Sequence, residues 1–214
     1  MLVYVGGESD EWVEKAISNA KNKNMVVVNM MEVLGDKVKE EELVEGMQVE
    51  DEDEHDHDED EHGHHHEEGH HHHHDKEEEV EYDEHVWLSL KNAVVLVNHL
   101  SEKIQKLDSA NANVYKSNAA SYVKQISDLD REYEKAEASS SKKTVLFGDR
   151  FPFRYLVDDY GLSYYAAFVG CSAETEASFE TIAFLAKKVD ELGLKSILTI
   201  EKSDKKIART ISSF

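Results

Sequence analysis

The chain has 214 residues and a formal net charge of −22, because 46 acidic residues outnumber 24 lysines and arginines. This charge argues against nucleic acid as a partner, since acidic side chains repel phosphates, and it favours cations instead. No apolar run reaches the roughly 18 residues of a membrane span, and the single cysteine, Cys171, leaves no disulfide within the chain.

The N-terminal part is predicted to form a βαβ unit. Leu2–Gly6 and Met25–Met30 are short β-branched runs, typical of buried strands in a parallel sheet. Between them, a helix is predicted to begin near Ser9 and Asp10 and to bury one apolar stripe. The stripe consists of Trp12, Val13, Ala16, Ile17 and Ala20.

A tract rich in histidine and acidic residues follows at residues 50–81, and we expect it to be disordered. Most of the negative charge is local, since residues 50–84 hold 19 acids and one base. Eleven of the thirteen histidines lie in the tract: His55, His57, His62, His64, His65, His66, His70, His71, His72, His73 and His74. Neutral imidazole is a common ligand of zinc, copper and nickel, and carboxylates add oxygen donors. The tract therefore predicts weak, multiple and quickly reversible metal binding, suited to capture, buffering or sensing. The alternative interpretation is a solvated acidic spacer.

Two long helices are predicted after the tract. Val97, Leu100, Ile104 and Leu107 are spaced by three and four residues, as in a helix with one buried face. A second helix, over residues 113–138, keeps the same spacing without glycine or proline. Its apolar positions are Tyr115, Ala119, Tyr122, Ile126, Leu129 and Tyr133.

The C-terminal part alternates strands and helices. Thr144–Phe147, Tyr164–Phe168 and Ser196–Ile200 are predicted strands. Helices are predicted at residues 153–160, at residues 178–192, where Gly193 ends the helix, and from about Lys205.

This order predicts an α/β protein with a bilobal fold, in which a long helix joins two parallel-sheet lobes. The N-terminal lobe takes residues 1–110 and includes the tract, the linking helix takes residues 111–140, and the C-terminal lobe takes residues 141–214. Both lobes are expected to be incomplete, and a cleft is expected between them.

One histidine outside the tract is a candidate for a fixed metal site. His85 lies in the sequence DEHVWL, residues 83–88, directly before the first long helix. A histidine that the local backbone holds in place can serve a defined site, whereas a mobile tract cannot. The alternative is a surface histidine beside an acidic N-cap.

These motifs resemble the zinc-binding solute-binding proteins of bacterial ABC metal importers, the cluster A-I family. The family's D-P-H-x-W-L is similar to DEHVWL, with Glu84 in place of proline, and its early G-x-G-x-E-x-W turn is similar to GGESDEW at residues 6–12. Its F-x-Y-L-x-x-x-[FY]-G-L resembles residues 153–162, and its S-P-E-x-E-P-S loop resembles residues 172–178. The resemblance covers nearly the whole chain and implies a bilobal solute-binding-protein fold.

The resemblance also implies a cleft that holds one metal with four ligands, two from each lobe. His85 matches the second ligand. The third position falls on Arg150, which cannot ligate a cation, so the neighbouring Asp149 is the expected substitute. A turn or N-cap acid is the alternative interpretation of Asp149. The first ligand would precede Met1 and the fourth would follow Phe214, so the resemblance implies about half of a site and a weakened zinc affinity.

The function that the resemblance implies is extracytoplasmic binding of zinc, or manganese, and its delivery to an ABC permease. The location would be the periplasm or the cell surface as a lipoprotein, with membrane contact only through the permease or a lipid anchor outside this chain. No enzymatic activity is expected, and G-x-S-x-G, P-loop and H-E-x-x-H motifs are absent. The alternative from the residues alone is a cytosolic histidine-rich metal buffer or metallochaperone.

Overall fold

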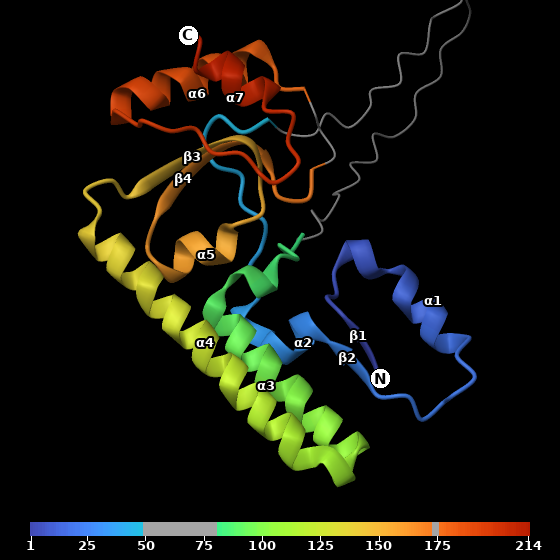
Figure 1. Cartoon of the computed structure of the whole chain (residues 1–214). Coiled ribbons are helices and arrows are strands. Elements are labelled where there is room, and N and C mark those ends of the chain that lie inside the picture. The colour runs from blue at the N-terminus through green and yellow to red at the C-terminus, as the bar shows by residue number, and fades with distance from the viewer. Residues whose placement is uncertain (49–80, 173–175) are drawn as a thin grey trace, which may run out of the picture.

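The computed structural model describes residues 1–48, 81–172 and 176–214. The predicted N-terminal βαβ unit is confirmed: β1 (Leu2–Tyr4) and β2 (Val27–Asn29) pair in parallel, and α1 (Trp12–Ser18) connects them (Figure 1). β2 ends earlier than predicted, because the Asn29 side chain accepts a hydrogen bond from the Glu32 N–H and caps α2 (Met30–Leu34).

The predicted apolar stripe of the first helix is wrong in part. Val13 is fully buried, whereas Trp12 and Ala16 are exposed. The helix begins at Trp12, after the short 3₁₀ turn Glu8–Asp10, in which the Asp10 carboxylate accepts hydrogen bonds from the N–H groups of Val5 and Gly6. That turn shortens the helix and reduces the face that it can bury.

The two predicted long helices are confirmed. The first, α3, spans Leu90–Leu107, and the second, α4, spans Ala112–Ser139. The two helices pack side by side as a hairpin (Figure 1). Of the apolar positions along α4, Ile126 is buried, while Tyr122, Leu129 and Tyr133 are exposed. No helix among the described residues is both long and apolar enough to cross a membrane.

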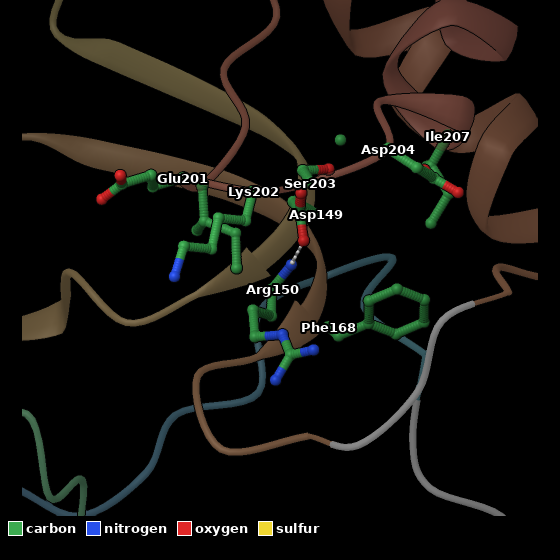
Figure 2. A pocket seen from close by; sticks show the side chains of 10 residues that line it. Asp149, Arg150, Phe168, Glu201, Lys202, Ser203, Asp204 and Ile207 are labelled. Atoms are coloured by element: carbon green, nitrogen blue, oxygen red, sulfur yellow. Dashed lines mark hydrogen bonds between the residues drawn. The ribbon is translucent and has the colours of Figure 1, made fainter.

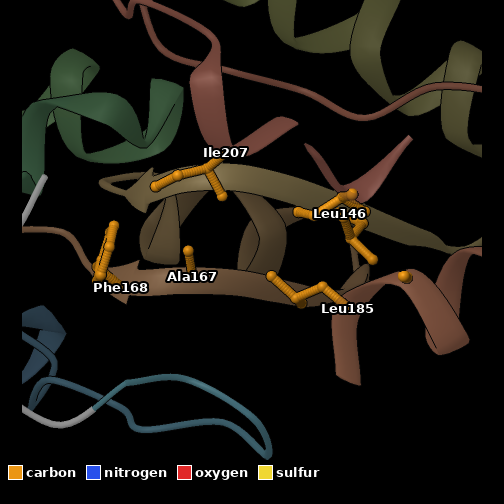
Figure 3. Close-up of a cluster of buried hydrophobic side chains, with 7 residues drawn as sticks. Leu146, Ala167, Phe168, Leu185 and Ile207 are labelled. Carbon is orange, nitrogen blue, oxygen red and sulfur yellow. The ribbon is translucent and has the colours of Figure 1, made fainter. Parts of the chain in front are cut away.

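The C-terminal unit is a second parallel sheet with helices on both faces. β3 (Thr144–Phe151) pairs with β4 (Ser163–Val169); α5 (Arg154–Asp159) lies on one side, while α6 (Phe179–Leu192) and α7 (Lys206–Ile211) cover the other (Figure 1). Under α6 and α7 the sheet buries a cluster that includes Leu146, Phe168 and Leu185 (Figure 3). Gly193 ends α6, as predicted, and the structure shows that it has the left-handed conformation.

The predicted third strand of this unit is reduced to one bridge. Within residues 196–200, Leu198 alone pairs with β3, through hydrogen bonds from the Leu198 N–H to the Leu146 carbonyl and from the Gly148 N–H to the Leu198 carbonyl. The chain then enters a loop in which Lys202 and Lys205 have positive φ angles, so the strand cannot continue.

A segment that the sequence did not single out connects the two units. The crossing arm, residues 38–48, runs from α2 to the C-terminal sheet (Figure 1). Met47 is buried against Phe147, Phe151 and Tyr164, and the Gln48 N–H donates a 2.9 Å hydrogen bond to the Ala167 carbonyl. The two units are therefore joined by α4 and, independently, by this arm.

Candidate metal centre

His85 is held in one orientation by its neighbour two residues earlier. A single oxygen, Oδ1 of Asp83, lies 3.0 Å from the ring Nδ1 of His85 and accepts the backbone N–H of His85 at 2.8 Å. The Asp83 side chain is 4% exposed and the His85 side chain 20% exposed. When the ring donates its Nδ1 proton to the carboxylate, Nε2 is left with a lone pair, which is how metal-binding histidines are commonly oriented.

The ring lies where the N-terminal unit meets the ends of the C-terminal strands. A Cβ atom at Gly170 would be 3.1 Å from Cε1 of His85 and 3.0 Å from the Phe151 carbonyl. Gly170 directly follows β4, and Phe151 is the last residue of β3. Ligands in open α/β sheets bind at the carboxyl ends of parallel strands, so His85 reaches the edge at which a ligand is expected.

An acidic cavity of about 220 Å³ is lined by Glu84, the residue before His85, although His85 itself does not line it. Its ionisable lining residues are Glu8, Glu41, Glu81, Glu84 and Cys171, beside Tyr82. Glu84 accepts a 2.8 Å hydrogen bond from the Ser9 N–H, which ties the N-terminal turn to the residue before His85. No lysine or arginine lines the cavity among the described residues, so its field favours a cation.

Two groups in this cavity have perturbed pKa values. Burial raises the pKa of Glu41, and the charges of Asp83 and Glu81 raise it further, although a hydrogen bond with Cys171 and the charge of His85 act in the opposite direction. Partial desolvation of the Cys171 thiol, together with the charges of Glu41, Glu84 and Asp83, raises the pKa of that thiol to about 12, although the residue as a whole is exposed. Without a cation nearby, the thiol therefore stays protonated at neutral pH and is a poor nucleophile.

Asp149, the other predicted cleft ligand, lies in an irregular part of β3. The strand register shifts between Phe147 and Arg150, and Oδ1 of Asp149 accepts the Arg150 N–H at 2.9 Å. Its Oδ2 atom is buried and has no hydrogen-bond partner among the described residues. The alternative interpretation as an N-cap is wrong, because Phe153 precedes α5 and makes no side-chain cap.

Asp149 and Arg150 line a second cavity, of about 430 Å³ (Figure 2). The loop Glu201–Asp204 closes one side of it, and Phe168 and Ile207 supply apolar walls. His85 lines neither this cavity nor the acidic one. Metal binding by Asp149 stays a prediction.

Within the described ranges, no three His, Cys, Asp or Glu side chains lie close enough to hold one metal ion. The eleven predicted histidine ligands of the tract lie outside the described residues. Sequence reasoning missed Glu41 and Cys171 as neighbours of His85. They are distant along the chain, and only the crossing arm and the end of β4 bring them together.

Two parallel α/β units joined by a long helix, with His85 where the units meet, form the bilobal α/β fold that was predicted. Two solved structures share this fold. The structure titled "Crystal structure of ZnuA" has a TM-score of 0.68 at 16% identity, covering 99% of this chain and 67% of that chain. The metal-dependent lipoprotein YcdH from Bacillus subtilis has a TM-score of 0.66 at 24% identity, covering 99% of this chain and 64% of that chain.

The sequence places the chain in a particular family. Residues 1–213 match the family described as "ZnuA: Zinc-uptake complex component A periplasmic", and the chain belongs to it. It is 31% identical over 131 residues to the zinc-binding protein AdcA of Streptococcus pyogenes serotype M1, covering 61% of this chain and 25% of that protein. It is also 31% identical over 131 residues to the high-affinity zinc uptake system protein ZnuA of Bacillus subtilis (strain 168), covering 61% of this chain and 40% of that protein. The matched region is therefore well under half of these relatives.

Proposed function

We propose that the chain is part of an extracytoplasmic zinc receptor that binds the ion through His85 and delivers it to an ABC permease. The observation that carries the proposal is the geometry of His85, whose Nδ1 faces the buried Asp83 carboxylate 3.0 Å away. This arrangement leaves Nε2 available for a metal. The family description names zinc uptake and the periplasm, and a relative from Streptococcus pneumoniae is named a zinc-binding lipoprotein.

The tract and His85 have different tasks in this proposal. The eleven histidines of the tract capture zinc weakly and release it quickly, because a low-complexity histidine run offers many competing sets of ligands. His85 holds zinc at a defined place, beside a cavity lined by four glutamates. Asp149 is the proposed ligand from the C-terminal unit. Manganese is the alternative cargo, since carboxylates suit that ion as well.

The second candidate function is a cytosolic metal buffer that uses the tract alone. The number of histidines between His55 and His74 favours it, because such a run binds metal without any folded site. In that case His85 would contribute nothing to zinc binding.

Calorimetric titration with zinc separates the two functions. The chain is compared with a variant that lacks residues 51–76, and each is also tested with His85→Ala or with His99→Ala as the control. His99 is the other histidine outside the tract. A receptor retains one zinc site after the deletion and loses it with His85→Ala but not with His99→Ala. Loss of all binding with the tract supports the buffer and contradicts the receptor.

A further inference from the structure

One buried tyrosine joins the two segments of chain that flank the histidine tract. Tyr155 belongs to α5 of the C-terminal unit and is 1% exposed. Its ring packs in a cluster with Leu34, Val86 and Leu96, which all belong to the N-terminal half. Tyr155 therefore packs in the core of the N-terminal half, although its helix belongs to the C-terminal unit.

The hydroxyl group of Tyr155 makes two backbone hydrogen bonds. It donates to the Asp83 carbonyl at 2.7 Å and accepts the Lys39 N–H at 3.0 Å. The Asp83 N–H in turn donates to the Lys39 carbonyl at 2.9 Å, so three hydrogen bonds close a ring. Lys39 lies in the crossing arm before the tract, and Asp83 lies in the segment that returns from it.

The same ring fixes the carboxylate that orients His85. The Asp83 backbone is held on both sides, by Lys39 and by Tyr155, and its Oδ1 contacts both the backbone N–H and the ring of His85. Without the hydroxyl, the Lys39 N–H and the Asp83 carbonyl would each lose a hydrogen-bond partner. Water could replace the hydroxyl only if the cluster of Leu34, Val86 and Leu96 opened. Burial also raises the pKa of Tyr155 to about 12, so its proton is present at neutral pH.

We propose that Tyr155 is a positioning residue for His85: through Asp83, its hydroxyl fixes the imidazole in the state that leaves Nε2 free for a metal. The role in metal binding rests on the proposed function, whereas the link from Tyr155 to the ring of His85 does not. The link also makes the state of the site depend on how the C-terminal unit is docked, because Tyr155 belongs to α5 of that unit.

The test uses a tract-substituted chain, in which the eleven tract histidines are glutamine and His85 and His99 are the remaining histidines. Tyr155→Phe is compared with Tyr160→Phe, which removes a hydroxyl 2.8 Å from Asp130, away from the ring of hydrogen bonds. Ring ¹⁵N NMR of the metal-free protein at about pH 8.5, above the ordinary pKa of imidazole, reports the tautomer of His85. The parent chain and Tyr160→Phe should show the Nδ1–H tautomer, and Tyr155→Phe a mixture of tautomers.

Zinc titration of the same proteins supplies the second readout. Tyr155→Phe should lower zinc affinity by roughly tenfold or more, the usual effect of losing an outer partner of a metal ligand, while Tyr160→Phe changes it less than twofold. An unchanged tautomer in Tyr155→Phe overturns the inference. If Tyr155→Phe changes the tautomer of His85, but zinc binding by the parent chain does not require His85, the positioning link is supported and the proposed function is contradicted.

A measurement on the unmutated tyrosine guards against a variant that fails to fold. In the tract-substituted chain, the Tyr155 hydroxyl proton should exchange with water far more slowly than that of the exposed Tyr82, because it is buried and donated to a carbonyl. Exchange at the same rate as Tyr82 would show that the hydrogen bond to Asp83 is absent, and the inference would fail.

Discussion

His85 illustrates how few atoms orient a metal ligand. One carboxylate oxygen of Asp83 contacts both the ring and the backbone of His85, and the absence of a side chain at Gly170 lets the ring lie against the end of β4. Glu41 lies nearby, and its raised pKa reports the cost of placing a charge among other acids and away from water. An arriving cation would relieve that cost.

Glu41 gives a prediction for stability as a function of pH. The pKa of Glu41 in the folded chain lies above the unfolded value of about 4.3. Between these two pKa values the folded chain binds the proton more strongly than the unfolded chain, so the free energy of unfolding falls as pH rises from the unfolded pKa through the folded one. Glu41→Gln should therefore raise the melting temperature at pH 8, on the order of a few degrees, and have little effect near pH 4. The exposed Glu40, changed to glutamine, is the control. An equal effect of both variants at pH 8 would contradict the argument.

At the scale of elements, the periodic segments were predictable and the irregular ones were not. The spacing of apolar residues in α3 and α4 predicted both helices, because a repeat of three and four residues that continues over several turns is a strong signal of a helix. The irregular register of β3 near Asp149 and the single bridge at Leu198 depend on pairing with distant segments. The 3₁₀ turn at Glu8–Asp10 is held in part by the distant Glu84, which accepts the Ser9 N–H. A local sequence pattern does not reveal such contacts.

The N-terminus of α3 carries the prediction at this scale. Ser89 is buried, accepts the Asn92 N–H at 3.0 Å and donates to Asp159 of α5 at 2.6 Å. Ser89→Ala should lower the free energy of unfolding by about 2–3 kcal/mol, since it removes a cap and a charge-assisted hydrogen bond.

The control for that measurement is Ser178→Ala, which removes the exposed cap of α6. It should cost about 1 kcal/mol in the same urea titration. Equal losses for the two variants would mean that the bond from Ser89 to Asp159 contributes nothing.

For the whole molecule, the decisive feature is the second connection between the units. The long helix and the alternation of strands and helices predicted a bilobal α/β protein, and the structural neighbours confirm that fold. The crossing arm was not predictable, because its EELVEGMQ sequence has no periodicity of helix or strand. The lobe boundaries at residues 110 and 140 stay predictions. The candidate site was predictable at His85, which a local motif contains, and not at Glu41 or Cys171, which lie outside the motifs. Tyr155 lies in the motif at residues 153–162, but that motif does not reveal that its hydroxyl reaches Asp83.

The arm should contribute measurably to global stability. Met47→Ala removes a side chain buried against Phe147 and Tyr164 and should cost about 2–3 kcal/mol in urea unfolding. Leu43→Ala, in the same arm but 59% exposed, should change stability by less than about 0.5 kcal/mol. Similar small effects for both variants would indicate that the arm is not docked on the C-terminal sheet.

Zinc titration of the tract-substituted chain, followed by ring ¹⁵N NMR, tests most directly whether His85 binds zinc. Two histidines remain, His85 and His99, so each nitrogen can be followed separately. We expect zinc to shift the Nε2 signal of His85 while its Nδ1 keeps its proton, and to leave His99 unchanged. If both histidines remain unchanged at zinc concentrations that saturate the unsubstituted chain, the tract alone binds the metal and His85 is not a zinc ligand.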